Sequence, residues 1–401
     1  MSADETMKIA TALATEVGRE QTARGLAGQL SAALPDRRVD LCLLFASAHF
    51  EDQIEEIALR LQDLLRPQAF IGTTAETVIR GDREYESRPA LALWAASLPG
   101  ARLRSFHLSQ EDLERFDSPE ALQEHLALTP DVAPHFLLLG DPFSFNVLEL
   151  LELLEVAYPG RPAIGGMASA AEEPGQNALV FDGQTLHHGL TGVGLWGNVQ
   201  VDTVVSQGCR PIGHHLVITK AERNVIYQLG GKPPLAVVTE MLADSPVQDR
   251  ELARRRGLLI GRVINEYQDK FARGDFLIRN PIGFDTNSGA MALNDLVRIG
   301  QTIQFHVRDG EAASEDLASL LSVTQSASAA GALLFDCSGR GTRLFSRPHH
   351  DARAIAQHCG SLPVAGFFCA GEVGPIGRRN FLHGHTASIA FFRPAADRSG
   401  A

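Results

Sequence analysis

Three segments of the chain repeat one order of features, and this repeat constrains the fold more than any single motif. Each copy opens with a short apolar run, at residues Leu41–Ser47, 136–142 and 332–338. A stretch with helical spacing of apolar residues follows, and a second apolar run then leads into a loop of small residues. Each copy closes with an alternating strand, at residues 90–95, 190–196 and 387–392. The repeated unit is therefore β-α-β-loop-β.

This unit predicts mixed sheets. Two strands joined by a helix should run parallel through a right-handed crossover, and the closing strand should return antiparallel. The expected fold class is α/β (or α+β), with mixed β-sheets flanked by helices and two related halves built from the repeated units. We place a first domain at residues 36–205 and a second at residues 206–393, because the alternating strand 199–205 gives way there to Ser206-Gln207-Gly208.

Charge and composition argue against several classes of partner. The chain has 401 residues and a formal net charge of −12, and an acidic surface repels nucleic-acid phosphates and anionic membranes. No apolar run approaches the ~20 residues that span a bilayer. Residues 1–12 lack the basic start and apolar core of a signal peptide. We therefore expect a cytoplasmic protein with no nucleic-acid partner and no membrane insertion.

Metal and cofactor motifs are incomplete. The five cysteines include no C-x-x-C pair, which argues against structural zinc and against a disulfide framework. The glycines at residues 192–197 match G-x-G-x-x-G, but an alternating strand follows them where a dinucleotide site needs a helix. His383 and His385 could share one face of a strand, yet no third ligand is visible nearby. We expect no metal and no cofactor.

Several stretches resemble a known family. They are residues 44–50, 71–76 and 91–99 in the first half, and residues 208–213, 275–280, 298–305, 337–341 and 366–380 in the second. Together they resemble the paired N- and C-terminal domains of the FIST family. The resemblance implies an intracellular sensory and signal-transduction module that binds a small ligand, with amino-acid-like ligands the usual suggestion. It implies no catalytic residues, so we expect a binding module and not an enzyme, with a separate signalling protein as its output.

The loop after the third copy's opening run is the first half of the expected ligand site. Its sequence is Cys337-Ser338-Gly339-Arg340-Gly341. The glycines allow backbone N–H groups to turn outward, and such nests bind anions. The Arg340 guanidinium could bind a ligand carboxylate, and a basic neighbour can lower the pKa of a cysteine thiol. The alternative for this segment is a tight glycine turn with a buried thiol.

The loop after the next apolar run supplies the second half of the expected site. The candidate ligand-binding residues there and just beyond it are Glu372, Arg378, Asn380, His383 and His385. Because the carboxyl ends of neighbouring parallel strands meet at one edge of a sheet, we expect both loops to wall one cavity. Glu372 would bind the ammonium group of an amino-acid-like ligand. A solvated charged loop is the alternative, with the ligand then in the first half near Ser47, His49 and Glu76.

Two other functions remain open at this point. Cys337 could be the nucleophile of an amidohydrolase or acyltransferase, with His383 or His385 as its base. The chain could also be a scaffold for other proteins, which would show as a large apolar surface patch without a polar-lined cavity.

Overall fold

The computed structural model describes residues 6–268, 270–324 and 328–395, and the chain divides into two compact units. The first unit combines Met1–Val205, Ala318–Leu382 and Thr386–Ala401, and the second combines Ser206–Leu317 and His383–His385. All three predicted repeats therefore lie in the first unit. The second predicted domain, residues 206–393, is shared between the two units, because the chain returns to the first unit after Leu317.

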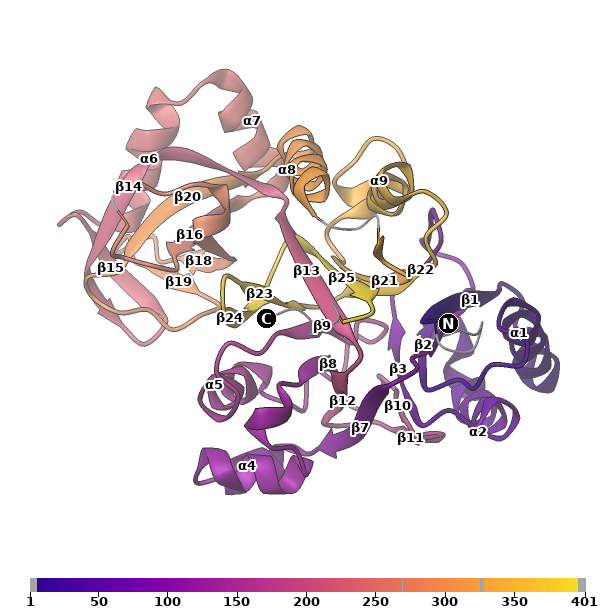
Figure 1. Cartoon of the computed structure of the whole chain (residues 1–401). Coiled ribbons are helices and arrows are strands. Elements are labelled where there is room, and N and C mark those ends of the chain that lie inside the picture. The colour runs from indigo at the N-terminus through magenta and orange to yellow at the C-terminus, as the bar shows by residue number, and fades with distance from the viewer. Residues whose placement is uncertain (1–5, 269, 325–327, 396–401) are drawn as a thin grey trace. The chain divides into compact units, whose positions relative to one another are not determined.

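The predicted order of elements is confirmed in each repeat (Figure 1). The first repeat consists of β2 (Leu41–Ser47), α2 (Ile54–Leu65), β3 (Ala69–Ala75) and β6 (Leu91–Ser97). The second consists of β8 (His135–Gly140), α5 (Val147–Ala157), β9 (Ala163–Met167) and β12 (Leu190–Gly197). The third consists of β21 (Gly331–Cys337), α9 (His350–Cys359), β22 (Val364–Cys369) and β25 (Thr386–Arg393). In each, the first two strands are parallel and the closing strand is antiparallel to the first.

Each repeat also contains a short β-hairpin before its closing strand, where the sequence predicts a loop. The hairpins are β4–β5 (Val78–Arg80, Arg83–Tyr85), β10–β11 (Leu179–Phe181, Gln184–Leu186) and β23–β24 (Glu372–Ile376, Arg379–His383). Each hairpin joins the sheet of a different repeat: β4–β5 that of the third, β10–β11 that of the first and β23–β24 that of the second. Each of these three sheets thus takes its last two strands from another repeat.

One further strand completes each sheet: β1 (Lys8–Ala14), β7 (Ala101–Leu108) or β13 (Gln200–Gln207). The strand orders are β1-β6-β2-β3-β10-β11, β7-β12-β8-β9-β23-β24 and β13-β25-β21-β22-β4-β5. The three orders correspond position by position. The third repeat folds with the first two because its sheet takes β13 on one side and the first repeat's hairpin on the other.

The inner faces of the three sheets share one hydrophobic core. Phe45 from β2, Leu139 from β8 and Phe335 from β21 all belong to it, and the rings of Phe45 and Phe335 meet edge to face. The outer faces pack against helices, with α1 (Arg19–Ala33) and α2 on the first sheet and α4 (Pro119–Leu126) and α5 on the second. Strands covered on both faces read as continuous apolar runs, as β2, β8 and β21 do. The short helix α3 (Gln110–Arg115) follows β7.

The described residues of the second unit form one sheet and three α-helices. Its strand order is β17-β16-β20-β14-β15-β19-β18. The strands are β14 (Cys209–Glu222), β15 (Val225–Leu229), β16 (Leu258–Val263), β17 (Phe276–Arg279), β18 (Pro281–Phe284), β19 (Met291–Leu293) and β20 (Thr302–Arg308). The helices are α6 (Pro234–Asp244), α7 (Val247–Arg256) and α8 (Gly310–Val323), which continues past the unit boundary. Ile218, Met291 and Phe305 belong to its core.

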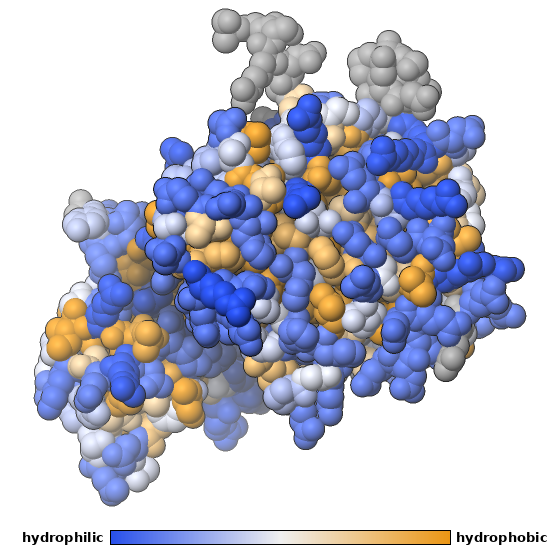
Figure 2. Space-filling model, turned by 90° about the horizontal axis from the view of Figure 1, so that it is seen from below, coloured by the Kyte–Doolittle hydropathy of each residue, from blue (hydrophilic) through white to orange (hydrophobic). Residues whose placement is uncertain are grey.

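The face drawn in Figure 2 is mostly hydrophilic, with small groups of hydrophobic side chains among charged ones, as is usual for a globular protein. Within the described ranges, no helix is long and apolar enough to cross a membrane.

One glycine in each second strand permits close approach to the first strand. Gly72, Gly165 and Gly366 pair with Leu44, Leu138 and Leu334. A Cβ added at these glycines would lie 2.5, 1.8 and 1.8 Å from the carbonyl oxygen of the paired leucine. Any larger residue there must displace backbone, so the three glycines mark one equivalent position in the three sheets.

We predict that Gly366→Ala lowers the free energy of unfolding by about 3 kcal/mol or more, because the added methyl group meets the Leu334 carbonyl oxygen. Gly25→Ala is the control: Gly25 is exposed in α1, and a Cβ there meets nothing within 4 Å. That variant should be neutral or up to about 1 kcal/mol more stable. Urea unfolding measures both. An unchanged midpoint for Gly366→Ala would contradict the close strand pairing.

Candidate functional site

The carboxyl ends of β21 and β22 lie side by side, as the sequence predicts. Cys337 lies opposite Cys369 in the parallel strand register. Ser338 donates from its backbone N–H and from its hydroxyl to the Cys369 carbonyl, each at 3.0 Å. Glu372 follows at the start of β23 and is fully buried. Its carboxylate accepts hydrogen bonds from the backbone N–H of Thr386 at 3.1 Å and from the Thr386 hydroxyl at 2.9 Å.

Burial changes the protonation of Glu372. Loss of solvation raises its pKa from 4.5 to about 8. Hydrogen bonds from Thr386 and Cys337 and the charge of Arg340 lower the pKa, but they offset only part of the effect of burial. Glu372 is therefore largely protonated at neutral pH, and in that form it does not supply the negative charge expected for binding an ammonium group.

Arg340 is fully buried in an ion-pair cluster and has no exposed surface. Its Nε lies 2.9 Å from an Asp336 oxygen and 2.7 Å from an Asp351 oxygen, and its Nη2 donates to Asp351 at 2.9 Å. The expected role of Arg340 as a ligand-binding cation therefore does not fit this conformation, because two aspartates already bind its guanidinium. Gly339 and Gly341 serve a tight turn here, with Gly341 at a positive φ of 55°.

Three carboxylates surround this arginine. Oxygens of Glu84, Asp336 and Asp351 lie within 4.8 Å of one another, a spacing that could hold a metal ion, but the Arg340 guanidinium supplies the positive charge. Glu84 comes from β5, and its Oε1 accepts from the N–H groups of Asp351 and Ala352 in the first turn of α9, at 3.0 and 3.1 Å. Burial, followed by the charge of Asp351, raises the pKa of Glu84 to about 7. A carboxylate side chain thus occupies the N-terminus of α9.

The basic end of the expected second loop lies away from Cys337. The segment is the β23–β24 hairpin, which runs antiparallel along β9 and so carries its tip toward the start of that strand. Asn380 accepts from the Ala163 N–H and donates to the Arg161 carbonyl, both at 2.8 Å, while Arg378 is exposed beside Gly160. Cys337, Ser338 and Glu372 are therefore brought together, whereas Arg378 and Asn380 are not.

The two histidines do not share a strand face. His383 is the last residue of β24 and is buried, whereas His385 lies in the following turn with a positive φ of 64°. The Nε2 atom of His385 lies 3.0 Å from the Asn280 side-chain oxygen, within the second unit. The predicted pairing of the two rings on one face is wrong because the strand ends before His385.

The first-half residues named as an alternative site are also engaged. The Ser47 hydroxyl lies 3.3 Å from Nδ1 of His49 and accepts from the Ala90 N–H at 3.1 Å. Glu76 forms an ion pair with both terminal nitrogens of Arg343. These contacts hold loops together.

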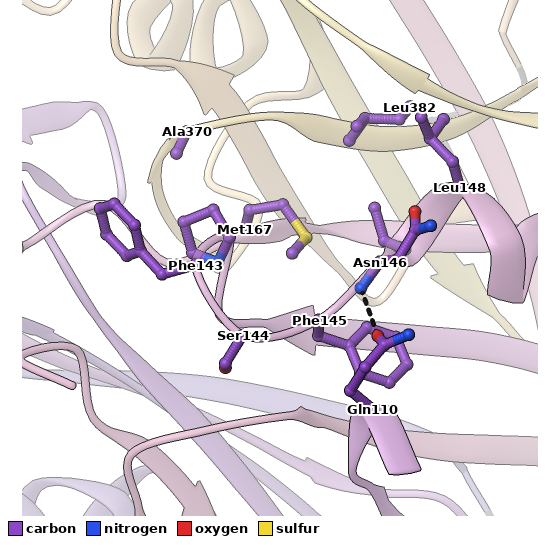
Figure 3. A pocket seen from close by; sticks show the side chains of 11 residues that line it. Gln110, Phe143, Ser144, Phe145, Asn146, Leu148, Met167, Ala370 and Leu382 are labelled. Atoms are coloured by element: carbon purple, nitrogen blue, oxygen red, sulfur yellow. Dashed lines mark hydrogen bonds between the residues drawn. The ribbon is translucent and has the colours of Figure 1, made fainter. Parts of the chain in front are cut away.

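The structure contains a cavity of about 510 Å³ at the carboxyl edge of the second sheet, which the sequence analysis missed. It lies between the loop after β8, the start of α5, the end of β9 and the β23–β24 hairpin (Figure 3). The lining residues are Gln110, Pro142, Phe143, Ser144, Phe145, Asn146, Val147, Leu148, Met167, Ala370 and Leu382. Figure 3 shows Phe143 and Ala370 on one side, Leu148 and Leu382 on the other, and Met167 between them.

Apolar side chains form most of the cavity wall, and the polar ones already have partners. Gln110 accepts from the Asn146 N–H at 2.9 Å, the Ser144 hydroxyl donates to Asp141 at 2.5 Å, and the Asn146 side chain caps α5. The sequence feature that could have indicated this cavity is the loop after β8, the opening run of the second copy. That loop presents Phe143 and the first turn of α5 presents Leu148, and these side chains are 42% and 40% exposed.

Comparisons with known proteins agree with the family resemblance. A model of the FIST N domain matches residues 40–232, and a model of the FIST C domain matches residues 234–375. An uncharacterised protein of Mycobacterium tuberculosis is 38% identical over 393 residues, covering 96% of this chain and all of the relative. One of Mycobacterium bovis is 37% identical over 391 residues, covering 96% of this chain and 99% of the relative. The crystal structure of a cyanuric acid hydrolase from A. caulinodans covers 97% of this chain and all of its own, but with 8% identity and a TM-score of 0.38 it supports no argument.

We predict that Glu372→Gln flattens the pH dependence of stability. The unfolded carboxyl ionises near 4.5 and the folded one near 8, so between these values the folded state holds a proton that the unfolded state has lost. Stability contributed by this group is complete below pH 4.5 and is lost as pH rises toward 8. The glutamine keeps the shape without the proton.

Urea unfolding at pH 5, 6.5 and 8 measures the effect. Relative to wild type, the variant should gain about 1–2 kcal/mol or more between pH 5 and 8. Glu84, with its pKa of about 7, titrates in both proteins and cancels from the difference. Parallel pH profiles for the two proteins would show that Glu372 is not held protonated.

Proposed function

Since this chain belongs to the FIST family, whose members are classed as sensory signal-transduction domains, we propose that it is a sensory module that binds a small molecule in the cavity of its second sheet. The cavity carries this proposal. Its volume of about 510 Å³ falls within the usual ~300–1,000 Å³ of small-molecule sites. It also lies where ligands gather in sheets of this kind, beyond the carboxyl ends of strands.

The lining indicates what kind of molecule would fit. Phe143, Phe145, Leu148, Met167 and Leu382 offer an apolar surface for a hydrocarbon or aromatic body. No charged side chain is among the residues that line the cavity, so an amino-acid-like ligand would find no carboxylate there for its ammonium group. The cavity therefore suits a small ligand with an apolar body better than it suits an amino acid.

The surroundings of Cys337 argue against the alternative that this thiol is a catalytic nucleophile. Its thiol hydrogen-bonds Glu372, whose raised pKa of about 8 leaves it a poor base at neutral pH. The buried charges around Arg340 are paired with one another, which is typical of a structural cluster. We propose a binding function for the chain and a structural role for the Cys337 loop.

The proposal includes a separate signalling protein that receives the output, in the cytoplasm. All five cysteines are free thiols, which suits a reducing compartment.

We predict that Ala370→Trp weakens ligand binding at least tenfold, because the indole would occupy the cavity from its rim. Ala370 is exposed, so the substitution should leave the fold intact. Ligands are first found by thermal shift with a panel of amino acids and small organic acids, since a ligand that binds only the native state raises the melting temperature. Isothermal titration then compares the variants.

Two control variants accompany Ala370→Trp. Ala32→Trp adds the same indole at an exposed position of α1 and should bind as wild type does. Cys337→Ala should also bind normally, which separates the cavity from the Cys337 loop. If Ala370→Trp binds like wild type while Cys337→Ala does not, the ligand site is the Cys337 loop and the proposal fails.

A further inference from the structure

The three sheets provide an internal comparison for the cavity. In each sheet, the glycine of the second strand pairs with one residue of a borrowed hairpin. Gly366 pairs with Ile79 in the third sheet, and Gly165 pairs with Val373 in the second. Ile79 and Val373 therefore hold equivalent positions. The β23–β24 hairpin completes the second sheet in the same way as the β4–β5 hairpin completes the third.

This equivalence extends to the residues opposite them. Glu84 lies opposite Ile79 in β5. Strand β24 follows β23 through the two-residue turn Gly377-Arg378, and counting back from that turn sets Leu382 opposite Val373. Leu382 therefore takes in the second sheet the place of Glu84 in the third. By the same count, three residues before Ile79 and Val373, Ala370 takes the place of Glu76.

Leu382 and Ala370, the residues at these two positions of the second sheet, both line the cavity. In the third sheet, the Glu84 carboxylate binds the first turn of α9 and Glu76 pairs with Arg343. In the second sheet, the equivalent helix is α5, and leucine and alanine stand where the two acidic side chains would be. In the third sheet, a carboxylate from the borrowed hairpin fills the N-terminus of the helix, whereas in the second sheet the equivalent place borders the cavity.

The donors at the start of α5 remain unmatched. The N–H groups of Val147 and Leu148 have no hydrogen-bond acceptor among the described residues, whereas that of Glu149 bonds the Asn146 side chain at 3.4 Å. The first N–H groups of a helix have no partner within it, and they favour an anion. Val147 and Leu148 both line the cavity, so these donors border the same space as its apolar wall.

We propose that the ligand of this cavity is a small carboxylate with an apolar body, whose carboxylate binds the first-turn amides of α5 as Glu84 binds those of α9. This inference rests on the proposed function and specifies its ligand class. A monocarboxylate fits better than a phosphate dianion, because the position equivalent to the ligand group is a glutamate and no lysine or arginine lines the cavity. The apolar body would lie against Phe143, Met167 and Leu382.

The test compares 3-phenylpropanoate with its neutral amide, 3-phenylpropanamide, by isothermal titration. Wild type should bind the acid about tenfold more tightly than the amide, as expected for charge-assisted hydrogen bonds. Leu382→Glu restores the internal carboxylate of the third sheet and should abolish this preference. Leu382→Gln is the matched comparison: its uncharged amide should weaken binding of the acid and of the amide probe alike, so their affinity ratio should stay near tenfold.

The outcomes separate this inference from the proposed function. Equal binding of acid and amide by wild type, both lost in Ala370→Trp, would leave the cavity as the ligand site and overturn the carboxylate class. Failure of both probes to bind would also overturn the carboxylate class, and the cavity would then be judged by the ligand found in the thermal-shift panel. The wild-type comparison does not depend on whether either Leu382 variant folds.

Discussion

The first unit depends on burial of three sheet faces against one another. A single β-α-β-β repeat covers one face of its sheet with helices and leaves the other apolar, as the inner row of Phe45, Leu139 and Phe335 shows. That face is removed from water only when three sheets meet. Hydrophobic burial of this kind is the dominant favourable term in folding, so the repeats are stable together. The exchange of hairpins ties the same three repeats through backbone hydrogen bonds.

Because the three sheets share one framework, residues at equivalent positions can be compared between repeats. The Gly72, Gly165 and Gly366 positions fix the register of the three sheets, so side chains at matching places can be compared directly. At the helix N-terminus of the third sheet stands the buried carboxylate of Glu84, and at the same place in the second stands Leu382. The framework is held in common, while the loops at the carboxyl edges differ. In the third sheet the Glu84 carboxylate occupies this place, and in the second sheet Leu382 lines the cavity.

The sequence predicted the repeats well because they rest on local patterns. Apolar runs such as Leu41–Ser47 are fully buried strands, and the parallel and antiparallel pairings follow from the crossover rule. The sequence did not predict the hairpins, because β4, β5, β10 and β11 are only three residues long, too short for an alternating pattern. These hairpins also pair with strands that are distant in the sequence. Arg340 looked like a ligand-binding cation because its loop is glycine-rich, but its partner Asp351 lies eleven residues away on α9, beyond what loop sequence reveals. Placing the cavity required knowing which hairpin completes which sheet.

The most direct test of the account is a crystal structure of the protein with 3-phenylpropanoate bound. The account predicts the carboxylate within hydrogen-bond distance of the Val147 and Leu148 N–H groups, with the phenyl ring between Phe143, Met167 and Leu382. Density for the ligand beside Cys337 and Glu372, with the cavity at α5 unoccupied, would contradict it.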